Sequence, residues 1–332
     1  MEPVRWGVLS TSSFAERRFL PGIRKSPLVT LAAVASRDLA RAADFAERND
    51  IPTAYGSYEE LLADPSIEVI YNPMPNDLHV EWTRRAAEAG KHVMCEKPMG
   101  LHAAEVATLL PLASRVHIAE AFMVRFHPQW HETRELVRSG SLGTVSHGHV
   151  AFSYVNVDAT NIRNIASNGG GALYDIGCYA IVAARWFFDA EPIRVAALMD
   201  IDPTFGTDRL TSGIFDFGDG RSCTFSVSTQ AVYHQRVQIY GSEGRLEITI
   251  PFNQLEDAPV TYLTHRGESV DGLDARRHVV STNNQYTSQG EAFSRRVREE
   301  EPTDAPLRDA LVNMGIIDAV FRAATSGRFE TI

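Results

Sequence analysis

Three polar side chains, Lys97, Asp175 and Tyr179, are of types that could serve proton-coupled hydride transfer. That reaction requires a base that takes a proton from an alcohol, or an acid that gives one to a ketone. Lys97 ends a β-rich run, and an ammonium at the carboxyl end of a strand can polarise a substrate oxygen. Asp175 and Tyr179 are four residues apart, so an α-helix places them on one face. A phenol can act as the acid or base if a cation such as Lys97 lowers its pKa.

Arg163 is a further candidate, because its forked donors can grip sugar hydroxyls or a carboxylate. The alternative, an exposed loop arginine, stays open. Two pairs of histidines, His127 with His131 and His147 with His149, invite a zinc interpretation. No cysteine or carboxylate stands with them at a recognisable ligand spacing, so we expect no metal.

The segment from Ser10 to Ala15 follows the first predicted strand, where dinucleotide-binding domains carry G-x-G-x-x-G/A. Only Ala15 fits that pattern. Ser10 and Ser12 replace the glycines that allow the tight turn and the close approach of the backbone to a phosphate. Serine hydroxyls can substitute in part, by donating hydrogen bonds and by capping the next helix. On this motif alone, a strand-to-helix turn without a ligand stays open.

Short β-rich runs alternate with helical stretches through the first 122 residues. The alternation predicts parallel βαβ units, hence a Rossmann-type, doubly wound parallel sheet. The predicted strands are Val4–Leu9, Val29–Ser36, Val69–Asn72, His92–Glu96 and Val116–Phe122. Helical stretches between them include Leu39–Asn49 and Val80–Ala89.

Long alternating runs follow residue 122 and predict a large, open, mostly antiparallel sheet. These runs are Val145–Val155, Ile193–Met199, Ser212–Phe217, Ser222–Thr229, Val237–Tyr240 and Arg245–Ile250. Helices are predicted at Gln129–Ser139, Gly171–Asp189 and Pro306–Ala324. The chain is therefore expected to combine an α/β dinucleotide-binding domain, residues 1–122, with an α+β substrate-binding and oligomerisation domain, residues 123–332.

Several motifs together resemble the glucose–fructose oxidoreductase / inositol dehydrogenase family (Gfo/Idh/MocA), in its sugar and dihydrodiol dehydrogenase branch. The stretch Ala89-Gly-Lys-His-Val-Met-Cys-Glu-Lys-Pro98 is similar to the family hallmark "AGKHVxxEKP". The segments 71–79, 120–128, 169–179 and 241–246 resemble further family motifs in the same order and spacing. The resemblance covers nearly the whole chain.

The resemblance implies roles for individual residues. Lys97 is expected to be a principal catalytic residue supported by Glu96, often with a cis bond before Pro98. Tyr179 stands where many members have histidine, and it is expected to act with Asp175 on the substrate, beside Arg163. The expected cofactor-binding residues are Ser10, Thr11, Ser12, Ser13, Phe14, Ser36, Arg37, Tyr71, Pro73, Asn76, His79, Glu96 and Lys97.

The end of the second strand predicts the cofactor. NAD enzymes usually place an acidic residue there to bind the ribose 2′-hydroxyl. Ser36 and Arg37 occupy that region instead, and both can bond a 2′-phosphate. Asp38 can reach the ribose too, but we expect it to cap the helix that starts at Leu39. We therefore predict NADP, with NAD possible.

Composition excludes some classes of protein. The net charge of −10 and the absence of a basic stripe argue against nucleic acid as a partner. Three separated cysteines are typical of a reducing cytoplasm, and neither a signal-peptide layout nor an apolar run of about 18 residues is present. We expect a cytoplasmic protein without a membrane segment. Helical cover for only one face of the second sheet predicts a homodimer or a higher homo-oligomer.

The expected activity is NADP-dependent hydride transfer between the cofactor and a sugar or sugar-like alcohol or carbonyl, of the aldose 1-dehydrogenase type. One alternative is a keto-sugar reductase, with a nucleotide-linked sugar as one option. A non-enzymatic, dinucleotide-sensing regulator is a third hypothesis, which the altered glycine loop permits. That hypothesis predicts loss of Lys97, Asp175 and Tyr179, and all three are present.

Overall fold

The computed structural model describes residues 1–332 and divides the chain into two compact units. The first unit comprises residues 1–126 and 284–314, and the second comprises residues 127–283 and 315–332. The sequence placed the boundary after residue 122 and assigned everything beyond it to one domain. That division did not include the return of residues 284–314 to the first unit.

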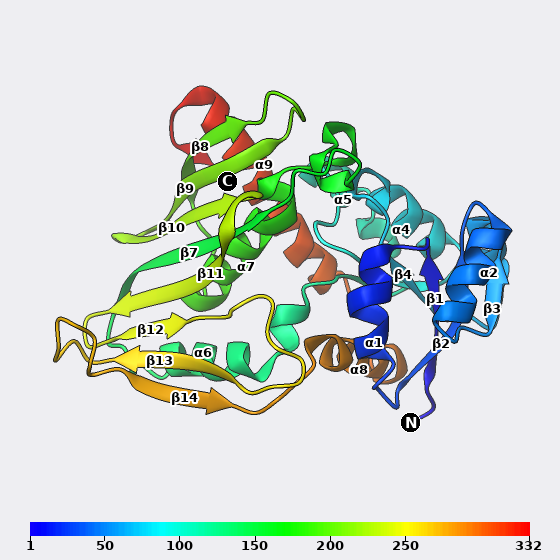
Figure 1. The fold of residues 1–332 in the computed structure, drawn as a ribbon, viewed down its shortest axis with the longest axis horizontal. Helices are drawn as coiled ribbons and strands as arrows, with labels where there is room; N and C mark the ends of the chain where they lie inside the picture. The colour runs from blue at the N-terminus through cyan, green and yellow to red at the C-terminus, as the bar shows by residue number, and fades with distance from the viewer. The chain divides into compact units, whose positions relative to one another are not determined.

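The first unit is built on a six-stranded sheet in which every pair is parallel, with the order β3-β2-β1-β4-β5-β6 (Figure 1). Its strands are β1 Val4–Leu9, β2 Val29–Ala35, β3 Thr53–Tyr55, β4 Val69–Asn72, β5 His92–Cys95 and β6 Ile118–Glu120. β1, β2 and β4 are almost continuously apolar and buried, as strands covered on both sides must be. The predicted Rossmann-type sheet is confirmed.

Helices follow the strands of this sheet, and side-chain caps define where some of them begin. Asp38 accepts hydrogen bonds from the amides of Ala40 and Arg41 at the start of α2, which confirms its predicted capping role. The helical elements are a π-helical turn at Ala15–Phe19, α1 Leu20–Ile23, α2 Leu39–Arg48, α3 Tyr58–Ala63, α4 His79–Glu88, α5 Ala103–Ala107, and 3₁₀ turns at Asn76–Leu78, Leu110–Leu112 and Met123–Phe126. The sequence analysis missed β3 and α3, which are too short for periodicity to reveal.

Helix α8, Gln285–Glu299, belongs to the first unit although it comes late in the chain. Trp6 in β1 donates its indole N–H to Ser294 Oγ at 3.2 Å, and its ring packs against Phe293. Arg298 donates to both carboxylate oxygens of Glu68 and to backbone carbonyls of the N-terminal segment. These contacts join α8 to the amino-terminal end of the parallel sheet.

The second unit is built on a nine-stranded sheet with the order β14-β13-β12-β11-β7-β10-β9-β8-β15 (Figure 1). All its pairs are antiparallel except β7 with β10, which confirms a mostly antiparallel sheet. The strands are β7 Val145–Val155, β8 Arg194–Ile201, β9 Asp208–Gly218, β10 Arg221–Ser228, β11 Gln230–Gly241, β12 Arg245–Ile248, β13 Val260–His265, β14 Arg276–Val280 and β15 Glu330–Thr331.

Helices cover one face of this sheet. They are α6 Pro128–Arg138, a π-helical segment Leu173–Gly177 continued by α7 Cys178–Phe188, and 3₁₀ turns at Ile162–Asn164 and Ala166–Asn168. The long helix α9, Ala305–Ser326, begins in the first unit and ends in the second. Val150 and Phe152 of β7 are buried, whereas His147 and His149 on its other face are exposed. The sheet therefore has one core face and one outward face.

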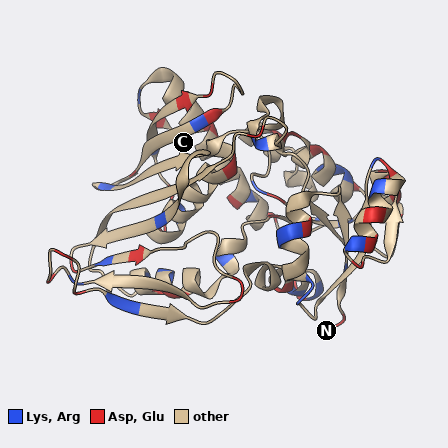
Figure 2. Cartoon of the chain, in the orientation of Figure 1, with Lys and Arg blue, Asp and Glu red and all other residues tan.

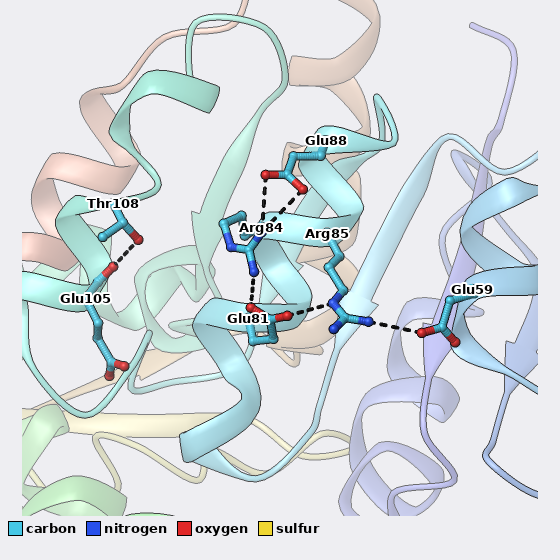
Figure 3. A network of polar contacts seen from close by, with 7 residues as sticks. All are labelled: Glu59, Glu81, Arg84, Arg85, Glu88, Glu105 and Thr108. Atoms are coloured by element: carbon cyan, nitrogen blue, oxygen red, sulfur yellow. Dashed lines mark hydrogen bonds and ion pairs between the residues drawn. The ribbon is translucent and has the colours of Figure 1, made fainter.

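Charged residues of both signs lie along α2 and on the surface of α4 (Figure 2). On α4, Arg84 pairs with Glu81 and Glu88, and Arg85 bridges Glu81 to Glu59 of α3 (Figure 3). These side chains are all more than a third exposed, so each pair adds little to the free energy of unfolding.

No helix has both the length and the apolar character that a membrane crossing requires.

We predict that Arg298→Ala lowers the free energy of unfolding by about 1–2 kcal/mol, because it removes charge-assisted hydrogen bonds to Glu68 that are mostly shielded from water. The hydrogen bond from Arg298 lowers the pKa of Glu68. The contribution is therefore present above the ordinary glutamate pKa and is lost as the pH falls through the lowered value.

The measurement is denaturant unfolding of wild type and variant at pH 7.5 and pH 3.5. Arg308→Ala is the matched control, because its pair with Asp304 is exposed and should contribute almost nothing. Equal losses in the two variants, or a loss that does not depend on pH, would contradict the prediction.

Candidate active site

The loop after β1 has the conformation of a glycine-type phosphate loop without its glycines. Ser10 adopts φ +73°, the left-handed region that glycine favours. Its amide donates to the Ala35 carbonyl at the end of β2. The helix then begins at Ser13, with Ser12 Oγ accepting from the Ala15 amide at 3.4 Å. The serine segment thus forms the tight turn that presents a helix N-terminus at the strand end.

The segment after β2 gathers two arginines. Ser36 is buried, and its amide donates to the Tyr55 carbonyl, while Arg37 is exposed. Burial raises the pKa of the Tyr58 phenol, and the guanidiniums of Arg37 and Arg41 beside it oppose that shift. Arg37, Arg41 and Tyr58 therefore form a cationic cluster with an aromatic member at the end of β2.

Glu96 connects the ends of β4 and β5. Tyr71 donates its hydroxyl to Glu96 Oε1 at 2.7 Å, and the amide of Lys97 lies 3.3 Å from Glu96 Oε2. Tyr71 is fully buried and stacks on Phe19 at 3.6 Å between ring centroids. Burial and the neighbouring Glu96 carboxylate hold the pKa of Tyr71 well above its usual range. Tyr71 thus positions Glu96 from inside the core, and Glu96 positions the Lys97 backbone.

The bond between Lys97 and Pro98 is cis, as the family resemblance implied. His79 joins this loop to the one after β4, with Nδ1 2.7 Å from the Pro98 carbonyl and Nε2 2.7 Å from the Met74 carbonyl. Burial lowers the pKa of His79 to about 4, although both carbonyls favour the protonated ring. A neutral ring donates to one carbonyl only. His79 therefore acts as a buried brace between the two loops.

Pro73 and Asn76, two further predicted residues, follow β4 in the chain. Pro73 is buried and Asn76 is half-buried. Asn72, which the sequence analysis did not select, donates to the His79 carbonyl and to Thr83 Oγ1.

Glu120, at the end of β6, is a buried carboxyl that the sequence analysis also missed. Its Oε1 accepts from the Met99 amide at 2.8 Å, and Asn313 of α9 donates to Oε2 at 3.3 Å. Burial raises the pKa of Glu120 to about 7, against the opposing charge of Arg125. Arg125 itself pairs with Asp309. The segment that follows Lys97 and Pro98 is thus tied to β6.

In the second unit, Asp175 is held by two side chains. Tyr154 of β7 donates its hydroxyl to Asp175 Oδ2, and Arg163 donates from Nε to Oδ1 at 3.0 Å. Burial and the Asp175 carboxylate raise the pKa of Tyr154, so this phenol stays protonated and keeps donating. The structure brings together the predicted Arg163 and Asp175. It adds Tyr154, for which an alternating strand gave no signal.

Tyr179 lies in a more apolar setting than Asp175. Its ring packs against Phe152 and Phe252, with centroids 5.9 Å and 5.4 Å away. The predicted helix is present, but the turn that carries Asp175 is π-helical and only the part from Cys178 onward is α-helical.

The four histidines of the zinc alternative each contact other groups, and His147 and His149 also contact each other and share Tyr240. His127 caps α6 by accepting from the Gln129 amide, and His131 packs against Trp186. His147 stacks on Tyr240, and His149 contacts Thr224. No group of three or more His, Cys, Asp or Glu side chains is arranged to hold a metal ion.

The first unit fits a nicotinamide dinucleotide. The left-handed Ser10 and the helix that begins at Ser13 supply a turn and backbone N–H groups for a pyrophosphate. The Arg37–Arg41–Tyr58 cluster supplies positive charge where the adenosine ribose of such a cofactor is bound in this fold. The cofactor would be held through these groups by Ser10 to Phe14, Ser36 and Arg37. Lys97, after β5, would hold it as well.

Comparison with known proteins gives a family match for each of the two units. Residues 4–124 match a family model described as an oxidoreductase family with an NAD-binding Rossmann fold, and residues 130–247 match the GFO/IDH/MocA C-terminal domain. An uncharacterized oxidoreductase of Rhizobium meliloti is 42% identical, with 100% of each chain covered. A D-xylose 1-dehydrogenase (NADP⁺) of Haloferax volcanii is 36% identical, over 97% of this chain and 98% of the relative.

Among solved structures, KijD10, a 3-ketoreductase from Actinomadura kijaniata in complex with NADP and TDP-benzene, is similar with a TM-score of 0.90. It is 28% identical, and the match covers 97% of this chain and 98% of that one. The named relatives are dehydrogenases and reductases. This supports the prediction that the chain is an enzyme over the alternative that it is a regulatory protein. The chain belongs to the GFO/IDH/MocA family of oxidoreductases and is an enzyme of the nicotinamide-dependent type.

Proposed function

We propose that this protein is an NADP-dependent aldose 1-dehydrogenase. The observation that carries the proposal is the Asp175 carboxylate, oriented by Tyr154 and Arg163, in a chain 36% identical over nearly its full length to a D-xylose 1-dehydrogenase. A fixed carboxylate accepts hydrogen bonds from neighbouring hydroxyls, which is the recognition that an uncharged sugar offers. Arg163 orients Asp175 by donating from Nε to Oδ1.

In the proposed reaction, an aldose loses its C1 hydroxyl proton and a hydride from C1, and becomes a lactone. The bound cofactor supplies the nicotinamide carbon that takes up the hydride. Tyr179, in its deprotonated form, accepts the hydroxyl proton, and the Lys97 ammonium stabilises the negative charge that develops on the substrate oxygen. Glu96 and His79 hold the loop that carries Lys97, so their part is to position it.

A keto-sugar reductase is the second candidate, favoured by the fold similarity to a 3-ketoreductase over 97% of the chain. The residues then act in the opposite direction, with Tyr179 giving a proton to the carbonyl oxygen. A screen of aldoses, polyols and TDP-linked keto-sugars, with NADP⁺ or NADPH and absorbance at the reduced nicotinamide band, tests the two candidates. Oxidation of D-xylose or a related aldose supports the first, and carbonyl reduction without aldose oxidation supports the second.

Lys97→Ala is predicted to lower turnover by roughly 10²–10⁴-fold, the scale of a lost proton-transfer or electrostatic group. Stability should be almost unchanged, because Lys97 is only half-buried. The measurement is kcat together with the denaturant midpoint. Lys25→Ala, at the end of the first helical segment, is the surface control. A variant with near wild-type turnover refutes the assignment of Lys97.

The arginine cluster at the end of β2 predicts the cofactor preference. NADP should bind at least about tenfold more tightly than NAD, which is roughly 1.4 kcal/mol. Arg37→Ala should remove most of this preference and leave NAD binding almost unchanged, because the guanidinium is proposed to pair with the 2′-phosphate. Dissociation constants for NADPH and NADH from fluorescence titration measure the ratio. Arg48→Ala, at the other end of α2, is the control, and an unchanged ratio in Arg37→Ala disproves this interpretation.

The outward face of the nine-stranded sheet is proposed to pair with a second copy of the chain. Leu198 of β8 and Val232 of β11 are 77% and 80% exposed, and the exposed His147 and half-buried Tyr240 stack beside each other. Covering such a face removes apolar and aromatic surface from water. Light scattering at micromolar concentration should give the mass of a dimer or larger assembly, and His147→Glu should shift it toward the monomer. A monomeric wild type refutes the proposal.

A further inference from the structure

Asp208, at the start of β9, is a buried carboxylate aimed at the helix that carries Asp175. It is 3% exposed, and its Oδ2 accepts from the Leu173 amide at 2.8 Å and from Thr211 Oγ1 at 2.6 Å. The amide of Ala172 also bonds this carboxyl and lowers its pKa. Asp208 therefore binds the first amides of the helix, which have no partners within the helix.

The three glycines before this helix let the chain pass close to that carboxylate. A Cβ on residue 171 would lie 2.0 Å from Asp208 Oδ1, and one on residue 170 would lie 2.5 Å from the Arg163 carbonyl oxygen. Gly171 also has φ +116°, and its amide donates to the Arg163 carbonyl at 2.8 Å. The glycine segment is thus held between the Arg163 loop on one side and Asp208 on the other.

The same segment connects the two ends of the Arg163–Asp175 pair. The Gly171 carbonyl accepts from the Asp175 amide at 3.1 Å, and the Gly171 amide bonds the Arg163 carbonyl. The side chains of Arg163 and Asp175 then meet at 3.0 Å. A shift of Gly171 therefore moves both partners, and Asp208 is the side chain that sets where Gly171 and the helix start lie.

We propose that Asp208 is a positioning residue for the active site, which sets the position of Asp175 and Arg163 by anchoring the helix start and the glycine segment. This role rests on the proposed function, in which Asp175 and Arg163 orient the sugar. Asp208 does not touch the substrate. Burial raises its pKa to about 6, so it is ionised at neutral pH, the form that a helix N-terminus stabilises.

The test compares Asp208→Ala with Asp216→Ala, which removes a carboxylate from the same strand. Asp216 bonds Arg194 and the Gly218 amide, away from the helix start. Hydrogen exchange followed by mass spectrometry reports on the peptide covering residues 169–180. Exchange there should become roughly tenfold faster in Asp208→Ala, the factor that a lost N-cap gives, and should not change in Asp216→Ala.

Turnover provides a second measurement. A purely structural role of Asp208 would not change kcat and the sugar KM while leaving cofactor binding intact. In Asp208→Ala, kcat should fall about tenfold or more and the sugar KM should rise, while the NADPH dissociation constant stays unchanged. Asp208→Asn keeps an acceptor oxygen and should restore most of both the exchange protection and kcat. If Asp208→Ala does not fold, Asp208→Asn against Asp216→Asn carries the same comparison with smaller differences.

The outcomes separate this inference from the proposed function. If exchange becomes faster in Asp208→Ala but the protein oxidises no aldose and reduces no keto-sugar, then Asp208 still anchors the helix start. The proposed activity is refuted in that case. Unchanged exchange at residues 169–180, or equal acceleration in Asp216→Ala, overturns the positioning role whatever the activity. An unchanged kcat in Asp208→Ala of an active enzyme overturns it too.

Discussion

The parallel pairing of β1, β2, β4, β5 and β6 is the constraint on which the candidate site residues of the first unit depend. Parallel strands end at one edge of their sheet, so the five loops that follow them are brought together there. Hydrogen bonds between the loops then fix their positions: Tyr71 to Glu96, His79 to the Pro98 carbonyl, and the Met99 amide to Glu120. The loop that carries Lys97 is thereby held by residues from three neighbouring strands.

In the second unit, Asp175 and Tyr179 have different surroundings. Asp175 lies among donors, whereas Tyr179, farther along the same helix, lies among aromatic rings. A carboxylate fixed by two donors recognises hydroxyls in one orientation, while a phenol in an apolar setting is sensitive to any nearby charge. In the proposed reaction Asp175 binds the substrate and Tyr179 transfers the proton, and these two environments suit those proposed roles.

The sequence predicted best the elements that have a continuous apolar run or a long alternating or helical pattern. The strands β1, β2, β4 and β7 and the helix α2 were found almost residue for residue, because their patterns of burial follow from regular geometry. It missed β3, α3, β13, β14 and α8. The first two are short, and β13 and β14 pair within a sheet whose outward face allows polar residues. Helix α8 is amphipathic, but its partner surface lies nearly 300 residues earlier in the chain.

By itself, the sequence determined the two kinds of sheet, the family, the capping role of Asp38 and the residue types that are proposed to carry the chemistry. These follow from local patterns that a chain reveals without folding. Only the tertiary structure decided that residues 284–314 belong to the first unit, that Tyr71 is a buried support for Glu96, and that Tyr154 and Asp208 organise Asp175 and its helix. A hydrogen bond between distant strands depends on how the sheet is ordered, and no short stretch of sequence encodes that order.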